Sequence, residues 1–314
     1  MNLQPPLLAG KPVKARIMIF SGILILSVSV FTMISLYLLE PFFGINMLAL
    51  QEMNEHLDSP AFLRALEFLQ IVQALGLFIV PVMVFSWLTE KNLVSYPGLN
   101  QGVPIISIIS VFALILAAQP IINWMAEWNS KMTLPVSLHA IQDWMKYAEE
   151  EAATLTEAFL TIKTPIDFVI VFIMVAVLPA IGEEMLFRGV IQKLLKEWLK
   201  NAHLAIFISA FLFSALHMQF FGFVPRLLLG MLLGYLLEWS GSLWLPVAAH
   251  FINNGSAVIL SYFQKQGKLN FDPDKIGTGE NSTFMLIVCL AIVSLLIVRL
   301  SKTKQETEIR TDVE

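Results

Sequence analysis

Cysteine is almost missing from this 314-residue chain, in which Cys289 is the only one. A single cysteine cannot form an intramolecular disulfide or a thiolate zinc cluster, so any metal would need histidine and carboxylate ligands. Charge is scarce as well, at 14% of the residues against about 25% in an ordinary soluble domain. The formal net charge of -4 offers no basic surface to nucleic acid. The composition therefore argues against a disulfide framework and against a DNA or RNA partner.

Apolar residues make up 57% of the chain, and the mean hydropathy is +0.72. A membrane span needs about 20 predominantly apolar residues. Eight runs qualify, at 17–39, 68–88, 103–122, 166–192, 203–219, 222–239, 243–260 and 283–300. The first run is too long for a signal-peptide core and lacks a cleavage pattern before Glu40, so we expect a retained helix. The sequence predicts an all-α fold, a polytopic integral membrane helical bundle with about eight transmembrane helices.

Lysine and arginine in short connections predict the orientation, because they gather on the cytoplasmic side. With eight spans, one side receives the basic residues Lys11, Lys14, Arg16, Lys91, Lys193, Lys196, Lys200, Lys302, Lys304 and Arg310. The opposite side receives the acidic residues Glu52, Glu55, Asp58, Glu149, Glu150, Glu151, Asp272, Asp274 and Glu280. We expect an integral protein of the cell membrane, plasma or inner, with both termini in the cytoplasm.

The long external connection, 123–164, is expected to have structure of its own. It contains the interface-favouring residues Trp124, Trp128 and Trp144, and apolar residues at helical spacing, namely Ile141, Met145, Ala148, Ala152, Leu155 and Phe159. This pattern predicts an amphipathic helix on the membrane surface. Two roles stay open for it, a solvated cap over the bundle and a lid that gates substrate.

The chain is expected to divide into three parts. Residues 1–164 hold the first three spans and the external connection, residues 165–260 hold the fourth to seventh spans, and residues 261–314 hold the last span and a cytoplasmic tail. In the sixth span, Gly230 and Gly234 have the small-xxx-small spacing that lets helices approach closely. Arg226 and Glu238, near the ends of that span, are expected to be membrane-boundary anchors.

Polar residues interrupt the apolar runs in three places. They are Glu183, Glu184 and Arg188, then Phe213 and His217, then His250 and Asn254. A charge at membrane depth costs about 2.5–3.5 kcal/mol even on a lenient scale, so several together indicate mutual pairing or a function. Residues four apart share a helix face, so Glu184 should pair with Arg188 while Glu183 points elsewhere. We expect a structural role for Glu184 and a chemical one for Glu183.

Each of these residues alone could be a polar contact that joins helices. Counting about 1.5 Å per residue from the predicted cytoplasmic ends puts Glu183 about 14 Å deep, His217 about 20 Å and His250 about 10 Å. These depths overlap within the uncertainty of the span ends. One site in the inner half of the bilayer, open toward the cytoplasm, is therefore expected.

The three motifs, in this order on consecutive helices, resemble the signature of the CPBP family of intramembrane proteases. This family includes type II CAAX prenyl proteases and the bacteriocin-processing and immunity proteins, also described as Abi-like. Its pattern is EExxxR, FxxxH and HxxxN or HxxxD, and every motif position is matched here, over about residues 165–260. The resemblance implies that the fourth to seventh spans form a proteolytic core.

The family's roles carry over to the matching positions. The resemblance implies catalytic residues Glu183, His217, His250 and Asn254, supported by Glu184, Arg188 and Phe213. Glu183 and His217 would activate the attacking water. His250 and Asn254 would stabilise the oxyanion of the tetrahedral intermediate, where preorganised donors in a dry site are worth several kcal/mol.

A metal mechanism is the alternative within the same class of enzyme. Zinc would be held by Glu183, His217 and His250, and proteins of this family are often labelled metalloproteases. Against zinc, the chain has no HExxH motif, and Asn254 is a poor zinc ligand. We expect a metal-free glutamate mechanism without a cofactor.

The sequence predicts an intramembrane endopeptidase that cleaves membrane-associated polypeptides, either prenylated CAAX-type proteins or peptide precursors. Its partners would be that substrate and the lipid bilayer. The alternatives are a non-catalytic immunity or scaffold protein of the same fold, and a proton-coupled transporter with Glu183 as its relay. The intact motifs disfavour the first alternative, and the lack of a clear internal repeat disfavours the second.

Overall fold

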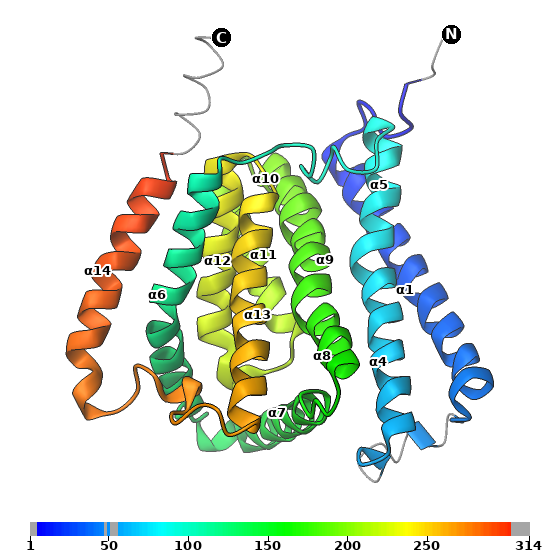
Figure 1. Ribbon diagram of the computed structural model, residues 1–314. Helices are drawn as coiled ribbons and strands as arrows, with labels where there is room; N and C mark the ends of the chain where they lie inside the picture. The colour runs from blue at the N-terminus through cyan, green and yellow to red at the C-terminus, as the bar shows by residue number, and fades with distance from the viewer. Residues whose placement is uncertain (1–4, 47–48, 51–55, 303–314) are drawn as a thin grey trace.

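Helices account for the whole regular architecture of the computed structural model, which describes residues 5–46, 49–50 and 56–302. Each predicted apolar run lies on a helix, and no strand occurs within these ranges. Four of the runs form α-helices without a π-helical interruption: α1 (Val13–Phe43), α6 (Ile105–Ser130), α13 (Trp244–Lys265) and α14 (Thr283–Leu300). The prediction of an all-α polytopic bundle is confirmed (Figure 1).

Two of the long helices contain π-helical segments. The label η is used both for these segments and for short 3₁₀ turns. The second run is α4 (Pro60–Ala74), η1 (Leu75–Ile79) and α5 (Val80–Glu90). The fourth run is α8 (Pro165–Phe172), η3 (Ile173–Val177), α9 (Leu178–Leu186), η4 (Phe187–Gln192) and α10 (Lys193–Leu199). The fifth and sixth runs are α11 (Ala202–Leu216) and α12 (Phe223–Ser240). Short 3₁₀ turns lie in the connections: η2 (Val136–Leu138), η5 (Phe220–Gly222), η6 (Pro273–Lys275) and η7 (Glu280–Ser282).

Six helical stretches in the described part of the chain are long and apolar enough to cross a membrane, two fewer than the sequence predicts. They are Val13–Phe43, Pro60–Glu90, Ile105–Ser130, Pro165–Leu199, Phe220–Ser240 and Thr283–Leu300. The helix α11 has only 15 residues. The helix α13 is long, but His250, Asn253 and Asn254 make it less apolar. Both nevertheless lie inside the bundle beside the longer helices (Figure 1).

The first helix begins and the last helix ends at the same end of the bundle (Figure 1), as an even number of crossings requires. Which side of the membrane this end faces stays a prediction. Of the residues used to predict it, Glu52, Glu55, Lys304 and Arg310 lie outside the described residues. Lys193 and Lys196 lie on α10 rather than in a connection, because the helix continues to Leu199.

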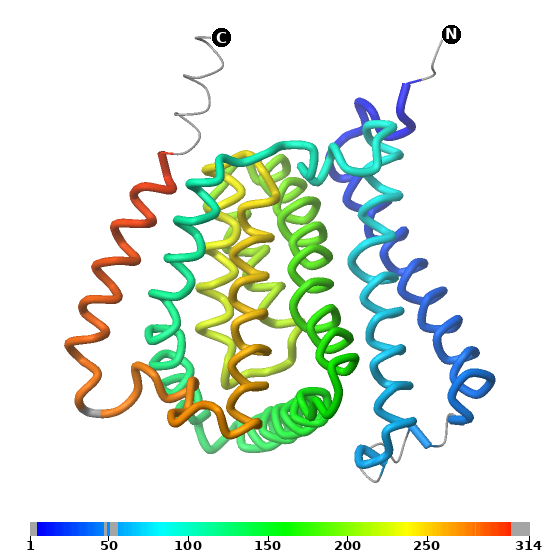
Figure 2. The backbone as a smooth tube through the Cα atoms, viewed as in Figure 1, coloured from blue at the N-terminus to red at the C-terminus, as the bar shows by residue number. Residues whose placement is uncertain are grey.

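The predicted amphipathic helix is present as α7 (His139–Phe159), which crosses the other end of the bundle (Figure 1). The connection 266–282 runs along the same end (Figure 2). The connection that contains α7 starts later than the expected residue 123, because α6 continues to Ser130. Only part of the predicted apolar face is buried: Phe159 packs against α4 side chains, whereas Ile141 is 48% exposed.

Close packing of α11, α12 and η4 surrounds the central polar residues. A Cβ atom at Gly234 would lie 2.8 Å from Ile206 of α11, and one at Gly230 would lie 3.1 Å from Ala210. Any larger side chain would push these helices apart, so the predicted packing role of the two glycines is confirmed. Their carbonyl groups have a second role: Gly230 accepts a hydrogen bond from Arg188, and Gly234 accepts one from Gln192.

Candidate functional site

The central helix, α8 to α10, presents to the site a backbone carbonyl that lacks the usual α-helical donor. Pro179 lacks an N–H, so it cannot donate to the carbonyl four residues earlier, which belongs to Val175 in η3. The side chain of Asn254 donates to this carbonyl, with Nδ2 3.0 Å from the Val175 oxygen. The sequence analysis missed this contact, although a proline in an otherwise helical run was the signal for it.

Glu184 and Arg188 form the predicted i, i+4 pair. The Arg188 Nη1 atom donates to Glu184 Oε1 at 2.9 Å, and both side chains are fully buried. Arg188 also donates through Nη2 to the Gly230 carbonyl at 2.9 Å, and its guanidinium lies 4.6 Å from the centre of the Phe213 ring. Glu184 Oε2 and Arg188 Nε make no hydrogen bond with the described residues. The pair links α9 to α12 across the centre of the bundle.

Glu184 has a second partner that the sequence analysis did not anticipate. His250 Nδ1 lies 2.8 Å from the same Oε1 atom that Arg188 contacts. A carboxylate only accepts, so His250 Nδ1 carries the proton in this contact, and Nε2 faces the other way. Glu184 therefore orients the imidazole of His250 on α13 in addition to holding Arg188.

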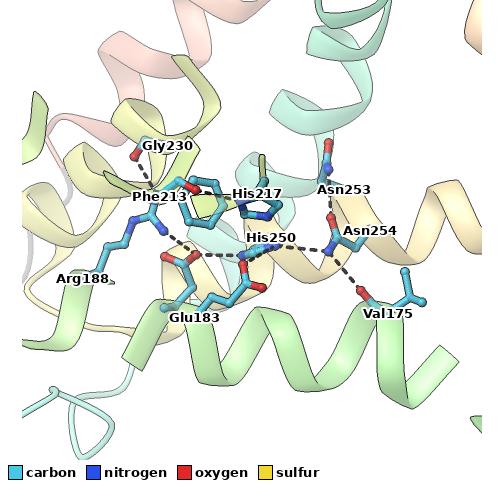
Figure 3. A network of polar contacts seen from close by, with 10 residues as sticks. Val175, Glu183, Arg188, Phe213, His217, Gly230, His250, Asn253 and Asn254 are labelled. Atoms are coloured by element: carbon cyan, nitrogen blue, oxygen red, sulfur yellow. Dashed lines mark hydrogen bonds and ion pairs between the residues drawn. The ribbon is translucent and has the colours of Figure 1, made fainter. Parts of the chain in front are cut away.

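Asn254 lies next to the remaining nitrogen of that imidazole. Its Nδ2 atom is 3.2 Å from His250 Nε2, and Asn253 Nδ2 donates to its Oδ1 at 3.1 Å. Together with the Val175 contact, these bonds define the orientation of the Asn254 amide, with Oδ1 as acceptor and Nδ2 as donor. The predicted proximity of His250 and Asn254 on one face of α13 is present in the structure (Figure 3).

Glu183 is the carboxylate without a direct partner. It is 9% exposed, and its Oε2 atom accepts no hydrogen bond from the described residues. Its closest approach to a basic side chain is to His250, whose Nε2 atom lies 3.9 Å from Glu183 Oε2. This separation is too long for a direct hydrogen bond, and a water beside both atoms could contact each of them.

His217 follows the last residue of α11 and is partly exposed. Its Nδ1 atom lies 2.7 Å from the carbonyl oxygen of Phe213, and the two rings are 4.8 Å apart. The Phe213 ring is also 5.9 Å from the ring of His250, so it separates and positions both imidazoles. No hydrogen bond or ion pair joins His217 to Glu183 in the described part of the chain, and the expectation that both residues activate one water stays a prediction.

The helix that holds Glu183 does not end at residue 192 but continues to Leu199. Glu183 therefore lies about 24 Å along the helix from its end, and its depth in the membrane stays a prediction. His217 lies where α11 ends, on the side of the bundle that α7 crosses. The side from which the site opens stays a prediction.

The predicted zinc ligands do not form a metal-binding group. Among the described residues, no three histidine, cysteine, aspartate or glutamate side chains lie close enough together to hold an ion. The imidazole of His250 is already used by Glu184 on one nitrogen and by Asn254 on the other. The arrangement does not fit zinc, and the metal-free mechanism stays a prediction.

Residues 165–256 match the family model described as type II CAAX prenyl endopeptidase Rce1-like. All three polar motifs lie inside this range, so the resemblance predicted from them is confirmed for this part of the chain. The match supports a CAAX-type membrane peptidase at the level of the family.

A segment of 84 residues is 36% identical to the Bacillus subtilis (strain 168) protein named Uncharacterized protein YpbD. The alignment covers 26% of this chain and 40% of that relative, so the chain spans less than half the length of the relative it matches. No solved structure matches the chain.

Proposed function

We propose, from the premise that residues 165–256 are Rce1-like, that the protein is an intramembrane endopeptidase that cleaves membrane-associated polypeptides with a glutamate-activated water. One observation carries the proposal: the buried Glu183 Oε2 has no hydrogen-bond partner and lies 3.9 Å from His250 Nε2. A water held beside this atom would be deprotonated by Glu183 as it attacks the peptide carbonyl.

His217 would hold the same water from the other side, as the family resemblance implies. Because the Phe213 carbonyl only accepts, His217 Nδ1 must carry a proton, and Nε2 is left for the water. Its partial exposure at the end of α11 suits a residue that contacts the substrate. Glu183 and His217 then share the water without touching each other.

His250 and Asn254 would stabilise the oxyanion. Their nitrogen atoms are 3.2 Å apart, so two N–H groups on them can point at one oxygen. In neutral His250, Nε2 accepts from Asn254. A proton on Nε2 would make it a donor, which could then point at the substrate oxygen.

The remaining residues would position these groups. Glu184 fixes the imidazole of His250, and Arg188 fixes Glu184. The Val175 carbonyl fixes the amide of Asn254. The proton that Glu183 takes from water would pass to the leaving amine, so that the carboxylate is regenerated in each cycle.

The substrate would be a membrane-associated polypeptide, either a prenylated CAAX-type protein or a peptide precursor. The test compares the membrane proteome and the secreted peptides of a deletion strain, a strain with Glu183→Ala and the parent. We expect the same uncleaved polypeptides to accumulate in both mutant strains. A Glu183→Ala strain identical to the parent would refute the assignment of Glu183, and would favour a non-catalytic or transport role.

Metal dependence is tested on the purified protein with a substrate found in this way. Activity should survive exhaustive chelation, and Glu183→Gln should still bind the substrate. Loss of activity on chelation, with recovery on adding zinc, would instead make His217 and His250 ligands.

A further inference from the structure

The register between η4 and α12 places Arg226 beside the site. Gly230 and Gly234, one turn apart on α12, accept hydrogen bonds from Arg188 and Gln192, which are also four residues apart. Both helices run in the same direction along the bundle. Arg226 lies one turn before Gly230 on the same face, which puts it at the level of Glu184. The expected role of Arg226 as a membrane-boundary anchor stays a prediction.

The guanidinium of Arg226 is held in place without an ion pair. Nη1 donates to the backbone carbonyl of Gln219 at 3.2 Å, and Nη2 donates to the side-chain Oε1 of Gln219 at 2.6 Å. No carboxylate of the described residues lies within ion-pair distance of it. Gly222 closes one side, where a Cβ atom would lie 3.3 Å from Nη2. Gln219 comes two residues after His217, so the cation belongs to the rim of the site.

The carboxylates near Arg226 do not neutralise it directly. Among the described residues, neither Glu149 of α7 nor Glu183 forms an ion pair or a hydrogen bond with Arg226. Glu149 uses one oxygen to accept from the backbone N–H of Phe221. A partly exposed guanidinium, fixed by two hydrogen bonds and lacking an anion, is a receptor for one.

We propose that Arg226 is a specificity-determining residue that binds a carboxylate of the substrate, namely the C-terminal carboxylate of the peptide that is cut. This inference rests on the proposed peptidase function. The guanidinium retains donors that Gln219 does not use, and its planar fork matches a carboxylate. The cleaved bond would then lie a short, fixed distance from the free C-terminus, and amidation of that terminus would remove the contact.

The test measures binding with the Glu183→Gln protein, which removes turnover. The probes are two synthetic peptides with a farnesylated cysteine and three further residues, identical except that one ends in a carboxylate and the other in an amide. We expect the amide to bind about 10- to 100-fold more weakly, the range for one charge-assisted contact. Adding Arg226→Gln should weaken the carboxylate peptide by the same factor and leave the amide peptide unchanged.

Two further variants separate the contact from a folding effect. Gln219→Ala keeps the charge of Arg226 but removes the side-chain acceptor that holds its guanidinium in place. Part of the preference for the carboxylate should therefore be lost. Lys196→Gln removes a cation at the other end of the bundle, where Lys196 pairs with Glu238, and should leave the preference intact. Melting temperatures of all variants identify any that are misfolded.

Equal affinity for the two peptides, or no measurable binding of either, would overturn the inference. An Arg226→Gln protein that is folded and still prefers the carboxylate would also overturn it. Failure of this inference and failure of the proposed mechanism can be told apart. If Glu183→Gln cleaved the carboxylate peptide, the role of Glu183 would be refuted, but the binding comparison would still test the role of Arg226.

Discussion

Glu183 and Glu184 are neighbours on α9, yet their carboxylates have opposite surroundings. Glu184 contacts Arg188 and His250 through one oxygen and has no exposed surface. Glu183 is nearly as buried, but its Oε2 atom has no partner. Adjacent residues on a helix diverge by about 100°, so one turns toward the cation of its own helix and the other away from it.

The difference teaches that burial alone does not distinguish a structural carboxylate from a chemical one. Removing one member of a buried ion pair lowers the free energy of unfolding strongly, because the other charge is left buried without a partner. A buried carboxylate without a partner can bind water and take its proton. The following variants test this contrast between Glu183 and Glu184, in order of decreasing expected effect.

The largest effect is expected for Glu183→Gln. The amide keeps the shape of the side chain but cannot act as a base, so turnover should fall about 1,000-fold, within the range for general-base catalysis. The melting temperature should stay near that of the parent, because no partner is lost. Cleavage rates and melting curves of the detergent-solubilised protein measure both. An active Glu183→Gln protein would reverse the assignment of the two carboxylates.

Glu184→Gln should act mainly on stability. It leaves Arg188 buried without its anion, a loss of about 3–5 kcal/mol for a fully buried pair. The double variant with Arg188→Met removes the stranded charge and should recover part of the folded yield. Activity should recover only in part, because His250 also loses its carboxylate. A Glu184→Gln protein with normal stability but no turnover would contradict the structural role.

Pro179→Ala should affect the site more weakly and through the backbone. The alanine N–H can donate to the Val175 carbonyl and would compete with Asn254 for it. We expect turnover to fall about tenfold, a little over 1 kcal/mol of transition-state stabilisation, without loss of thermal stability. The matched control is Pro81→Ala, at the equivalent place after η1 on the neighbouring helix. Equal losses in both variants would exclude the proposed competition.

The smallest effect is expected for Lys196→Gln. Its pairing with Glu238 joins two partly exposed side chains, and such pairs contribute about 0.2–1 kcal/mol. Yield and cleavage rate should match the parent. A destabilisation as large as that of Glu184→Gln would show that the contrast between buried and exposed pairs does not hold in this bundle.

Local spacing was enough to predict several features of the site. The Glu184–Arg188 pair, the Phe213–His217 contact and the Gly230 packing all follow from residues four apart on one helix. Each of the eight apolar runs lies on a helix in the described part of the chain, although only six of these stretches are long and apolar enough to cross a membrane. Helix ends were less accurate, because the sequence of α10 remains compatible with a helix after the apolar run ends at residue 192.

Contacts between helices could not be predicted in the same way. The Glu184–His250 contact joins residues 66 apart in the sequence, and it depends on how α9 and α13 pack. The position of Arg226 depends on the register between η4 and α12, which apolar periodicity does not determine. The motif order suggested that these helices meet, but it carried no information about which atoms touch.

The two π-helical segments of the central helix have a consequence for aligning relatives. A π-helical segment is equivalent to an α-helix with one residue inserted, and one residue turns everything beyond it by about 100°. The segments η3 and η4 flank α9, so the nine residues that include Glu183 have a helical phase of their own. A relative that lacks the insertion would align with a one-residue gap between 173 and 177. Such a gap would rotate α8 against the membrane while leaving Glu183 and Glu184 facing the same neighbours.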